Sequence, residues 1–76
     1  MIAQIHVPLM TADGHADGYT LTLDDEGKWV CTEWPEVAES MTRLHAGTFQ
    51  EWNGDIGAWQ ASDAAQRLGG TILYLR

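Results

Sequence analysis

The feature that most constrains the fold is an alternation of apolar residues over residues 1–9, which Ile2 alone interrupts. Positions 1, 3, 5, 7 and 9 are all apolar, whereas positions 4, 6 and 8 are Gln, His and Pro. An apolar period of two is typical of a β-strand that buries one of its faces. Because proline has no backbone N–H to donate, Pro8 predicts either an edge position for this strand or its end.

A second and a third strand are expected on either side of an acidic turn. Residues 19–23 alternate apolar residues with threonines, and residues 28–32 bring a short apolar run. Residues 24–27 (Asp-Asp-Glu-Gly) predict a hairpin turn between them, because glycine readily adopts the positive φ that such a turn requires. Residues 11–18 contain two Asp-Gly steps and no large apolar side chain, so they are expected to form a turn or loop.

A helix is predicted from Pro35 to a C-terminal cap at Gly47. Proline suits the first position of a helix, and glycine is common directly after the last one. Between them Val37, Met41 and Leu44 recur at positions i, i+4 and i+7, which is the spacing of one helical face.

The remainder of the chain predicts two short strands, a short helix and a closing strand. Residues 48–52 and 56–60 flank an Asn-Gly pair, which is a strong hairpin signal. Ser62 can cap a short helix over residues 63–68, and the Gly-Gly pair that follows would end it. Residues 71–75 are strongly apolar, which favours a strand in the centre of the sheet.

The predicted fold is therefore a single compact α+β domain over residues 1–76. It has a mainly antiparallel sheet of about five to six short strands with one longer and one short helix, in the order β-β-β-α-β-β-α-β. A chain of 76 residues has room for one domain. It has one cysteine, no signal peptide and no apolar run near the roughly 20 residues of a membrane span, so a cytoplasmic protein is expected.

The composition favours protein partners over nucleic acids. Four Lys and Arg against eleven Asp and Glu give a formal net charge of -7, and nucleic-acid phosphates repel such a surface. Most of the carboxylates lie within residues 13–39, where Lys28 is the only Lys or Arg. These acidic residues are Asp13, Asp17, Asp24, Asp25, Glu26, Glu33, Glu36 and Glu39.

The acidic segment has two interpretations that the residues alone leave open. It is either a solvated surface that keeps a small domain soluble, or one continuous face complementary to a basic groove on a partner. Trp29 and Trp34 bracket the segment, and an acidic rim around an aromatic anchor is typical of a tight protein interface. Glu51, Trp52 and Asp55 form a second, smaller candidate patch, with Trp52 either exposed there or packed beneath the short helix.

Neither a metal site nor a catalytic site is predicted. Residues 13–18 (Asp-Gly-His-Ala-Asp-Gly) match the spacing at the start of a calcium loop, but the third position is a His and the flanking segments are predicted strands. An ordinary turn is the preferred interpretation. Cys31 is expected to be a buried, inert thiol, and no nucleophile elbow or phosphate-binding loop occurs, so no cofactor is expected.

In these features the chain resembles small acidic phage-encoded inhibitors, among which anti-CRISPR proteins are the best match. The resemblance rests on size, charge, a single α+β domain, the lack of active-site motifs and the acidic run from Asp13 to Glu39. It implies a non-catalytic inhibitor that acts as a DNA mimic: its carboxylates would replace phosphates on a basic, nucleic-acid-binding surface of a Cas protein or effector complex. No residue role is carried over from it.

Two further hypotheses are kept. One is a small structural or assembly module that homodimerises through a sheet edge or an exposed Trp pair, or that docks into a larger particle. The other, least favoured, is a metal-dependent enzyme or sensor that uses Asp13, His15 and Asp17. Obligate self-association favours the assembly module, whereas a strict monomer favours the inhibitor.

Overall fold

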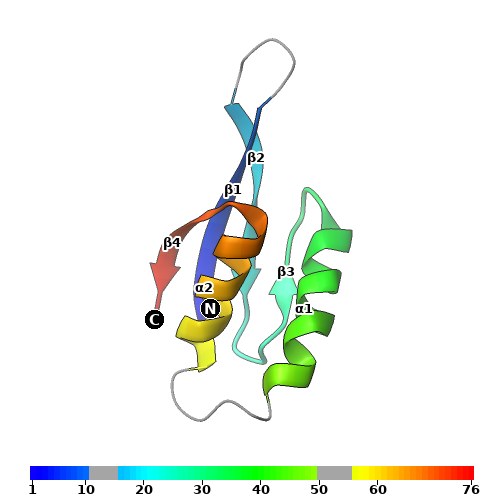
Figure 1. Ribbon diagram of the computed structural model, residues 1–76, viewed down its shortest axis with the longest axis vertical. Helices are drawn as coiled ribbons and strands as arrows, with labels where there is room; N and C mark the ends of the chain where they lie inside the picture. The colour runs from blue at the N-terminus through cyan, green and yellow to red at the C-terminus, as the bar shows by residue number, and fades with distance from the viewer. Residues whose placement is uncertain (11–15, 50–55) are drawn as a thin grey trace.

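The structure, a computed structural model, describes residues 1–10, 16–49 and 56–76. Four strands form one antiparallel sheet in the order β3-β2-β1-β4: β1 (Ala3–Met10), β2 (Ala16–Leu23), β3 (Trp29–Val30) and β4 (Thr71–Leu75). Two helices, α1 (Pro35–Phe49) and α2 (Ile56–Leu68), cover one face of this sheet (Figure 1). The predicted α+β class is therefore confirmed. The predicted five to six strands are wrong, because the described residues form four.

The hydrophobic core lies between the two helices and the inward face of β1 and β2. The period-two prediction for these strands is confirmed, and their register pairs Ala3 with Leu23 and Ile5 with Leu21. Polar side chains occupy the opposite face, where the Gln4 amide donates to the Thr22 hydroxyl over 3.4 Å. The buried apolar residues are Ala3, Ile5, Val7, Tyr19, Leu21, Leu23, Trp29, Cys31, Ala38, Met41, Ala61 and Ala64.

Two predictions about strand position are wrong. β1 is a central strand, although Pro8 predicted an edge or an end, and β4 is an edge strand, although its apolar run predicted the centre. β2 pairs along the whole of β1, whereas β4 pairs with β1 only over Ala3–His6. Pro8 therefore lies in a stretch of β1 that β2 alone flanks, where a missing N–H is tolerated.

The turn between β2 and β3 is confirmed. Gly27 has a φ of 84°, and its N–H donates to the Asp24 carbonyl over 3.1 Å. The Asp24 carboxylate accepts the N–H groups of Glu26 and Lys28 at 2.9 Å each, so it stabilises the turn from within. β3 is shorter than the predicted strand over residues 28–32, because the chain leaves the sheet at Cys31 to enter α1.

The second half of the chain contains one long helix where a strand over residues 56–60 and a short helix were predicted. α1 continues through Gly47 to Phe49, so Gly47 is not its cap, and residues 56–60 form the first half of α2. The helix is explained by its buried face, which consists of Gly57, Gln60, Ala61 and Ala64. Three of these residues are small, so this face can lie close to the sheet. The glycine in α1 costs only about 1 kcal/mol, which tertiary packing offsets.

Gly69 and Gly70 end α2, as predicted, although Ser62 does not begin it. Ser62 lies exposed in the middle of the helix. Gly69 has a φ of 71°, and the Gly70 N–H donates to the Ala65 carbonyl over 2.8 Å, which is the pattern of a Schellman cap. This turn redirects the chain into β4.

Several predictions fall partly or wholly outside the described residues. The predicted loop over 11–18 is one of them, and its last three residues, 16–18, belong instead to β2. The Asn-Gly hairpin and residues 50–52 of the predicted strand are not described. Of the helices in the described ranges, none has the length and apolar character needed to cross a membrane.

Candidate protein-binding surface

Six of the described acidic residues form two groups at opposite ends of β3. One group forms the β2–β3 turn: Asp24, Asp25 and Glu26. The other lies at the start of α1: Glu33, Glu36 and Glu39. Figure 1 shows the turn near the C-terminal end of α1, while the beginning of the helix lies at the far end. The structure therefore divides the acidic segment into two patches and does not join them in one face.

Of the five other polar and aromatic residues predicted for the site, the structure describes only Asp17. Asp17 pairs with Leu9 in the ladder between β1 and β2. The others lie outside the described residues, and their proposed roles stay predictions: Asp13, Glu51, Trp52 and Asp55.

The turn group is largely engaged within the molecule. The Asp25 carboxylate accepts hydrogen bonds from the Met1 ammonium at 3.0 Å and from the Arg76 guanidinium at 3.1 Å. The hydrogen bond and charge of the ammonium, aided by Arg76, hold the pKa of Asp25 below its usual value. Since Asp24 also caps its own turn, two of the three carboxylates in this group are held by contacts within the molecule.

The start of α1 is different, because its aromatic and acidic side chains face outward. Trp34 is 46% exposed, and its ring meets the buried Tyr19 ring edge-on with 5.5 Å between centroids. Its backbone N–H donates to the Cys31 sulfur over 3.3 Å, which fixes the chain at the entry to the helix. Glu33 and Glu36 are exposed on either side of Trp34 in the sequence.

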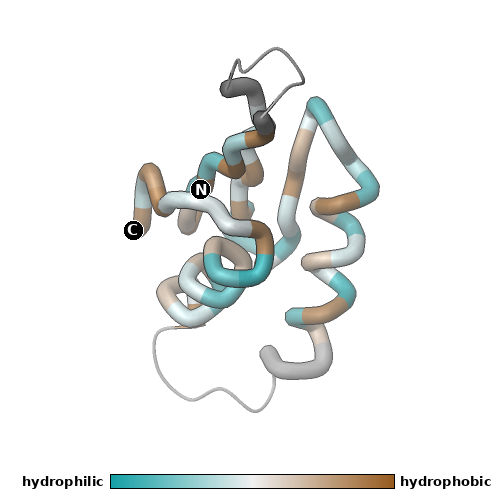
Figure 2. The backbone as a smooth tube through the Cα atoms, turned by 45° about the horizontal axis from the view of Figure 1, so that its top comes forward, coloured by the Kyte–Doolittle hydropathy of each residue, from teal (hydrophilic) through white to brown (hydrophobic). Residues whose placement is uncertain are grey.

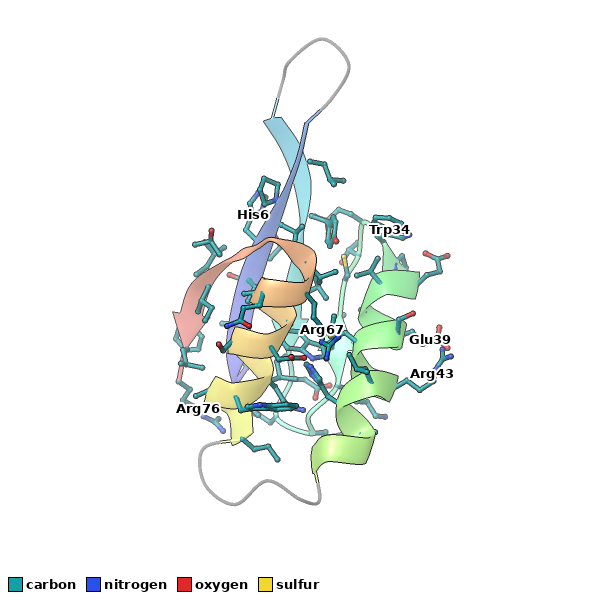
Figure 3. All side chains as sticks on the ribbon, viewed as in Figure 1. His6, Trp34, Glu39, Arg43, Arg67 and Arg76 are labelled. Atoms are coloured by element: carbon teal, nitrogen blue, oxygen red, sulfur yellow. The ribbon has the colours of Figure 1, made fainter. Side chains whose placement is uncertain are left out.

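Trp34 borders an apolar groove of about 330 Å³ between α1 and the end of α2, here called the Trp34 groove. Among the described residues that line it, Glu36 is the only charged one. In Figure 3, Trp34 stands at the start of α1, and Glu39 and Arg43 project from the outer side of the same helix. The groove is lined by Trp34, Glu36, Val37, Ser40, Met41 and Leu68.

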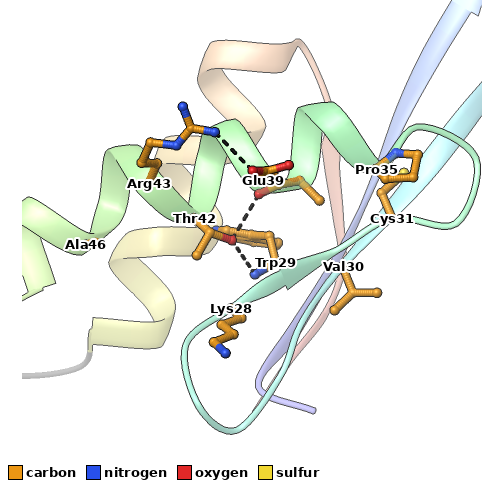
Figure 4. Close-up of a pocket in the computed structure, with 10 residues that line it drawn as sticks. Lys28, Trp29, Val30, Cys31, Pro35, Glu39, Thr42, Arg43 and Ala46 are labelled. Atoms are coloured by element: carbon orange, nitrogen blue, oxygen red, sulfur yellow. Dashed lines mark hydrogen bonds and ion pairs between the residues drawn. The ribbon is translucent and has the colours of Figure 1, made fainter.

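A second groove of about 430 Å³ lies between β3 and α1 (Figure 4). Its floor is apolar and includes Trp29 and Cys31, but its rim carries both signs of charge. Lys28 lies on one wall, and on the other Arg43 donates to Glu39 over 3.3 Å. This mixed rim provides no preference for a partner of one charge.

A buried polar chain that the sequence did not reveal joins β3, α1 and α2. The Trp29 indole N–H donates to His45 Nδ1 over 3.0 Å, because an indole nitrogen can only donate. His45 Nε2 therefore carries the proton and donates to Asp63 over 2.7 Å. Both ring nitrogens of His45 are thus hydrogen-bonded. These two bonds join α1 to β3 and to α2, and they leave no ring nitrogen free to act as a base.

Asp63 completes this chain at the surface of the helix pair. Arg67 donates to the same Asp63 oxygen over 2.9 Å, from one turn further along α2. Burial alone would raise the pKa of Asp63, but the hydrogen bonds from His45 and Arg67, together with their charges, lower it. In the sequence only the i, i+4 spacing of Asp63 and Arg67 hinted at this arrangement.

Cys31 is buried, as the sequence predicted. Within the described ranges, no three His, Cys, Asp or Glu side chains are grouped so that they could hold a metal ion. Trp29 is also buried, which leaves Trp34 as the exposed member of the pair that brackets the acidic segment.

Comparison with known proteins adds no relative, since no protein-family model, curated protein or solved structure matches the chain. Fold and surface together define a small α+β domain with an exposed tryptophan in an acidic setting.

Proposed function

We propose that the protein is a non-catalytic inhibitor that occupies a basic nucleic-acid-binding surface of another protein with the acidic surface around Trp34. The observation that supports this is the exposed Trp34 ring beside an apolar groove, in whose described lining Glu36 is the one charged residue. Lysine or arginine side chains of a partner would meet Glu33 and Glu36, while an apolar side chain would enter the groove.

The way Trp34 is held favours its use as an anchor. Tryptophan is among the residues that most often dominate binding energy, and its contact with Tyr19 restricts the ring before a partner arrives. A restricted anchor loses less conformational entropy on binding. The carboxylates would mainly accelerate association and select a basic partner. The resemblance to anti-CRISPR proteins makes a Cas protein or effector complex the expected target.

The test is capture of the target from a lysate of the host, followed by competition. Tagged protein should retain a basic nucleic-acid-handling protein at low salt and lose it at high salt, because salt screens exposed charges. Added nucleic acid should displace the captured protein. Trp34→Ala and the double variant Glu33→Gln/Glu36→Gln should each weaken binding by at least roughly tenfold.

Two control variants match these changes in kind and exposure. Leu44→Ala removes an apolar side chain that is 45% exposed on the same helix but does not line the Trp34 groove. Asp25→Asn/Glu26→Gln removes two charges from the other acidic group. Both should bind as the unmodified protein does. Capture that survives high salt, nucleic acid and Trp34→Ala would refute the proposal.

The second candidate function is a small assembly module, and a different surface favours it. β4 is an edge strand whose five residues are all exposed, and four of them are large and apolar. Sedimentation at several concentrations separates the two functions, because a module that works by self-association does not stay monomeric.

A further inference from the structure

β4 is an unusually apolar edge strand. Its residues Ile72, Leu73, Tyr74 and Leu75 are between 39% and 58% exposed, and the strand contains neither a charged residue nor a proline. Figure 2 shows the same feature as a largely brown segment beside the C-terminus. Natural sheet edges are usually protected by charges, prolines, bulges or a covering element, because unpaired backbone groups there recruit other strands.

Nothing in the described part of the chain covers the outer side of β4. The sheet order ends at this strand, and α2 packs against the face of the sheet (Figure 1). A shift in register between Gln4 and Ile5 is a bulge or irregularity that leaves Leu73 without a direct partner on β1, but it places no element on the outer side of β4. The backbone groups on the outer side of the strand therefore have no strand partner among the described residues.

We propose that β4 pairs with β4 of a second copy of this chain, antiparallel and centred on Leu73. The five-residue strands overlap fully only in this register, which places Leu73 opposite itself and Ile72 opposite Tyr74 of the other copy. Such a contact is two-fold symmetric and joins two four-stranded sheets into one. The proposal rests on the second candidate function and is independent of Trp34.

The distribution of charge favours a second copy as the occupant. Two copies with a net charge of -7 repel each other over most of their surfaces, and this repulsion is weaker at β4, which contains no Asp or Glu. In the centred register the two Arg76 side chains lie at opposite ends, about 20 Å apart along the strands. The three central pairs are apolar on both sides, which buries no unpaired charge.

The exposed area indicates how strong this contact is. Pairing would bury at most the area now exposed on ten strand residues, on the order of 800 Å² in total, and even this upper limit is below the range of standard stable interfaces. The backbone hydrogen bonds of a new strand pair add to this apolar area. We therefore expect a weak dimer that forms as concentration rises.

Sedimentation velocity of the whole chain tests the proposal with two variants of equal charge change. Leu73→Lys places a cation on the β4 edge, and Val30→Lys places one on β3, where Val30 is 52% exposed. Both make the chain less acidic by one charge, so general repulsion would fall in both. The sedimenting mass of the unmodified chain and of Val30→Lys should rise from 8.4 kDa toward twice that value. Leu73→Lys should remain a monomer.

Cross-linking provides a second readout if a lysine variant fails to fold. Leu73→Cys lies on the proposed two-fold axis, so mild oxidation should link two copies, whereas Val30→Cys should remain unlinked. A chain that stays monomeric up to roughly 1 mM, or dimers that persist in Leu73→Lys, would overturn the proposal. Trp34→Ala should dimerise like the unmodified chain, so failure of this inference and failure of target capture are distinguishable.

Discussion

Of the two edges of the sheet, one is protected and the other is open. At β3 the outward Trp29 N–H donates to the Thr42 hydroxyl of α1 over 2.8 Å (Figure 4), and the Trp29 side chain is buried against His45. At β4 all five residues are exposed, and the described residues place no element on the outer side. One edge is closed by the chain's own helix, whereas the other is left open.

The difference follows from the length of each edge strand and from what the rest of the chain places against it. β3 has two residues, so one hydroxyl from α1 and one buried tryptophan are enough to block further pairing. β4 has five exposed residues, and its outer edge has no strand partner among the described residues, so that edge needs another strand. Protection at β3 is intramolecular, and we expect protection at β4 to come from association.

The largest expected effect comes from removing the buried centre of the closed side. His45→Ala leaves the Trp29 indole N–H without its acceptor, removes one of the two donors to Asp63 and creates a cavity. The free energy of unfolding should fall by about 3–4 kcal/mol, a large share of the stability of so small a domain. Urea denaturation followed by tryptophan fluorescence measures this. Leu44→Ala, at an exposed position, is the control. If His45→Ala lowers the free energy of unfolding by less than about 1 kcal/mol, the buried hydrogen bonds of His45 do not stabilise the fold as proposed.

A smaller effect tests the closure of β3 alone. Thr42→Val keeps the side-chain shape but removes the oxygen that accepts the Trp29 N–H, so unfolding should become easier by about 1–2 kcal/mol. The Trp29 amide should also exchange its hydrogen faster. Thr32→Val at an exposed position should change stability by less than about 0.5 kcal/mol. An unchanged Trp29 amide would show that Thr42 does not close this edge.

The pH dependence of stability sharpens the account of Asp63. Its pKa is lowered in the folded state, so the unfolded chain binds the proton more readily on the acid side. The contribution of Asp63 is therefore present above its ordinary pKa of 3.8 and is lost as the pH falls through the lower folded value. Asp63→Asn should flatten the acid limb of a plot of unfolding free energy against pH. Parallel curves for the two proteins would contradict this.

The smallest effect is expected on the outer side of α1. Arg43 and Glu39 pair at i, i+4, but both side chains are exposed. Arg43→Ala should therefore change the free energy of unfolding by only about 0.2–0.5 kcal/mol, and less at high salt. Thermal unfolding at two salt concentrations measures the difference. A larger loss would mean that this pair helps to hold α1 against β3.

The parts of the fold that sequence predicted correctly depend on local signals. β1 and β2 follow from apolar alternation, and the turn follows from an aspartate and a glycine that act within four residues of each other. Residues 56–60 were predicted wrongly because the run is short and Gly57 favours neither a strand nor a helix. Only their packing against β1, which is distant in sequence, selects the helix.

Exposure of the two tryptophans and of β4 could not be predicted from sequence, because it depends on contacts between distant residues. Trp29 and Trp34 lie five residues apart in similar surroundings, yet one is buried and the other is exposed. Burial of Trp29 depends on His45, which accepts its indole N–H from 16 residues away. Likewise, the edge position of β4 follows from which strands pair with β1, and an apolar run alone carries no information about that.

Hydrogen exchange at two protein concentrations tests the contrast between the edges most directly. The Trp29 amide should be protected in both dilute and concentrated samples, because α1 closes that edge. The amides of Thr71–Leu75 that point away from β1 should exchange rapidly when dilute and become protected when concentrated. Slow exchange of those amides in dilute solution, or no change with concentration, would contradict an open edge that pairs with a second copy.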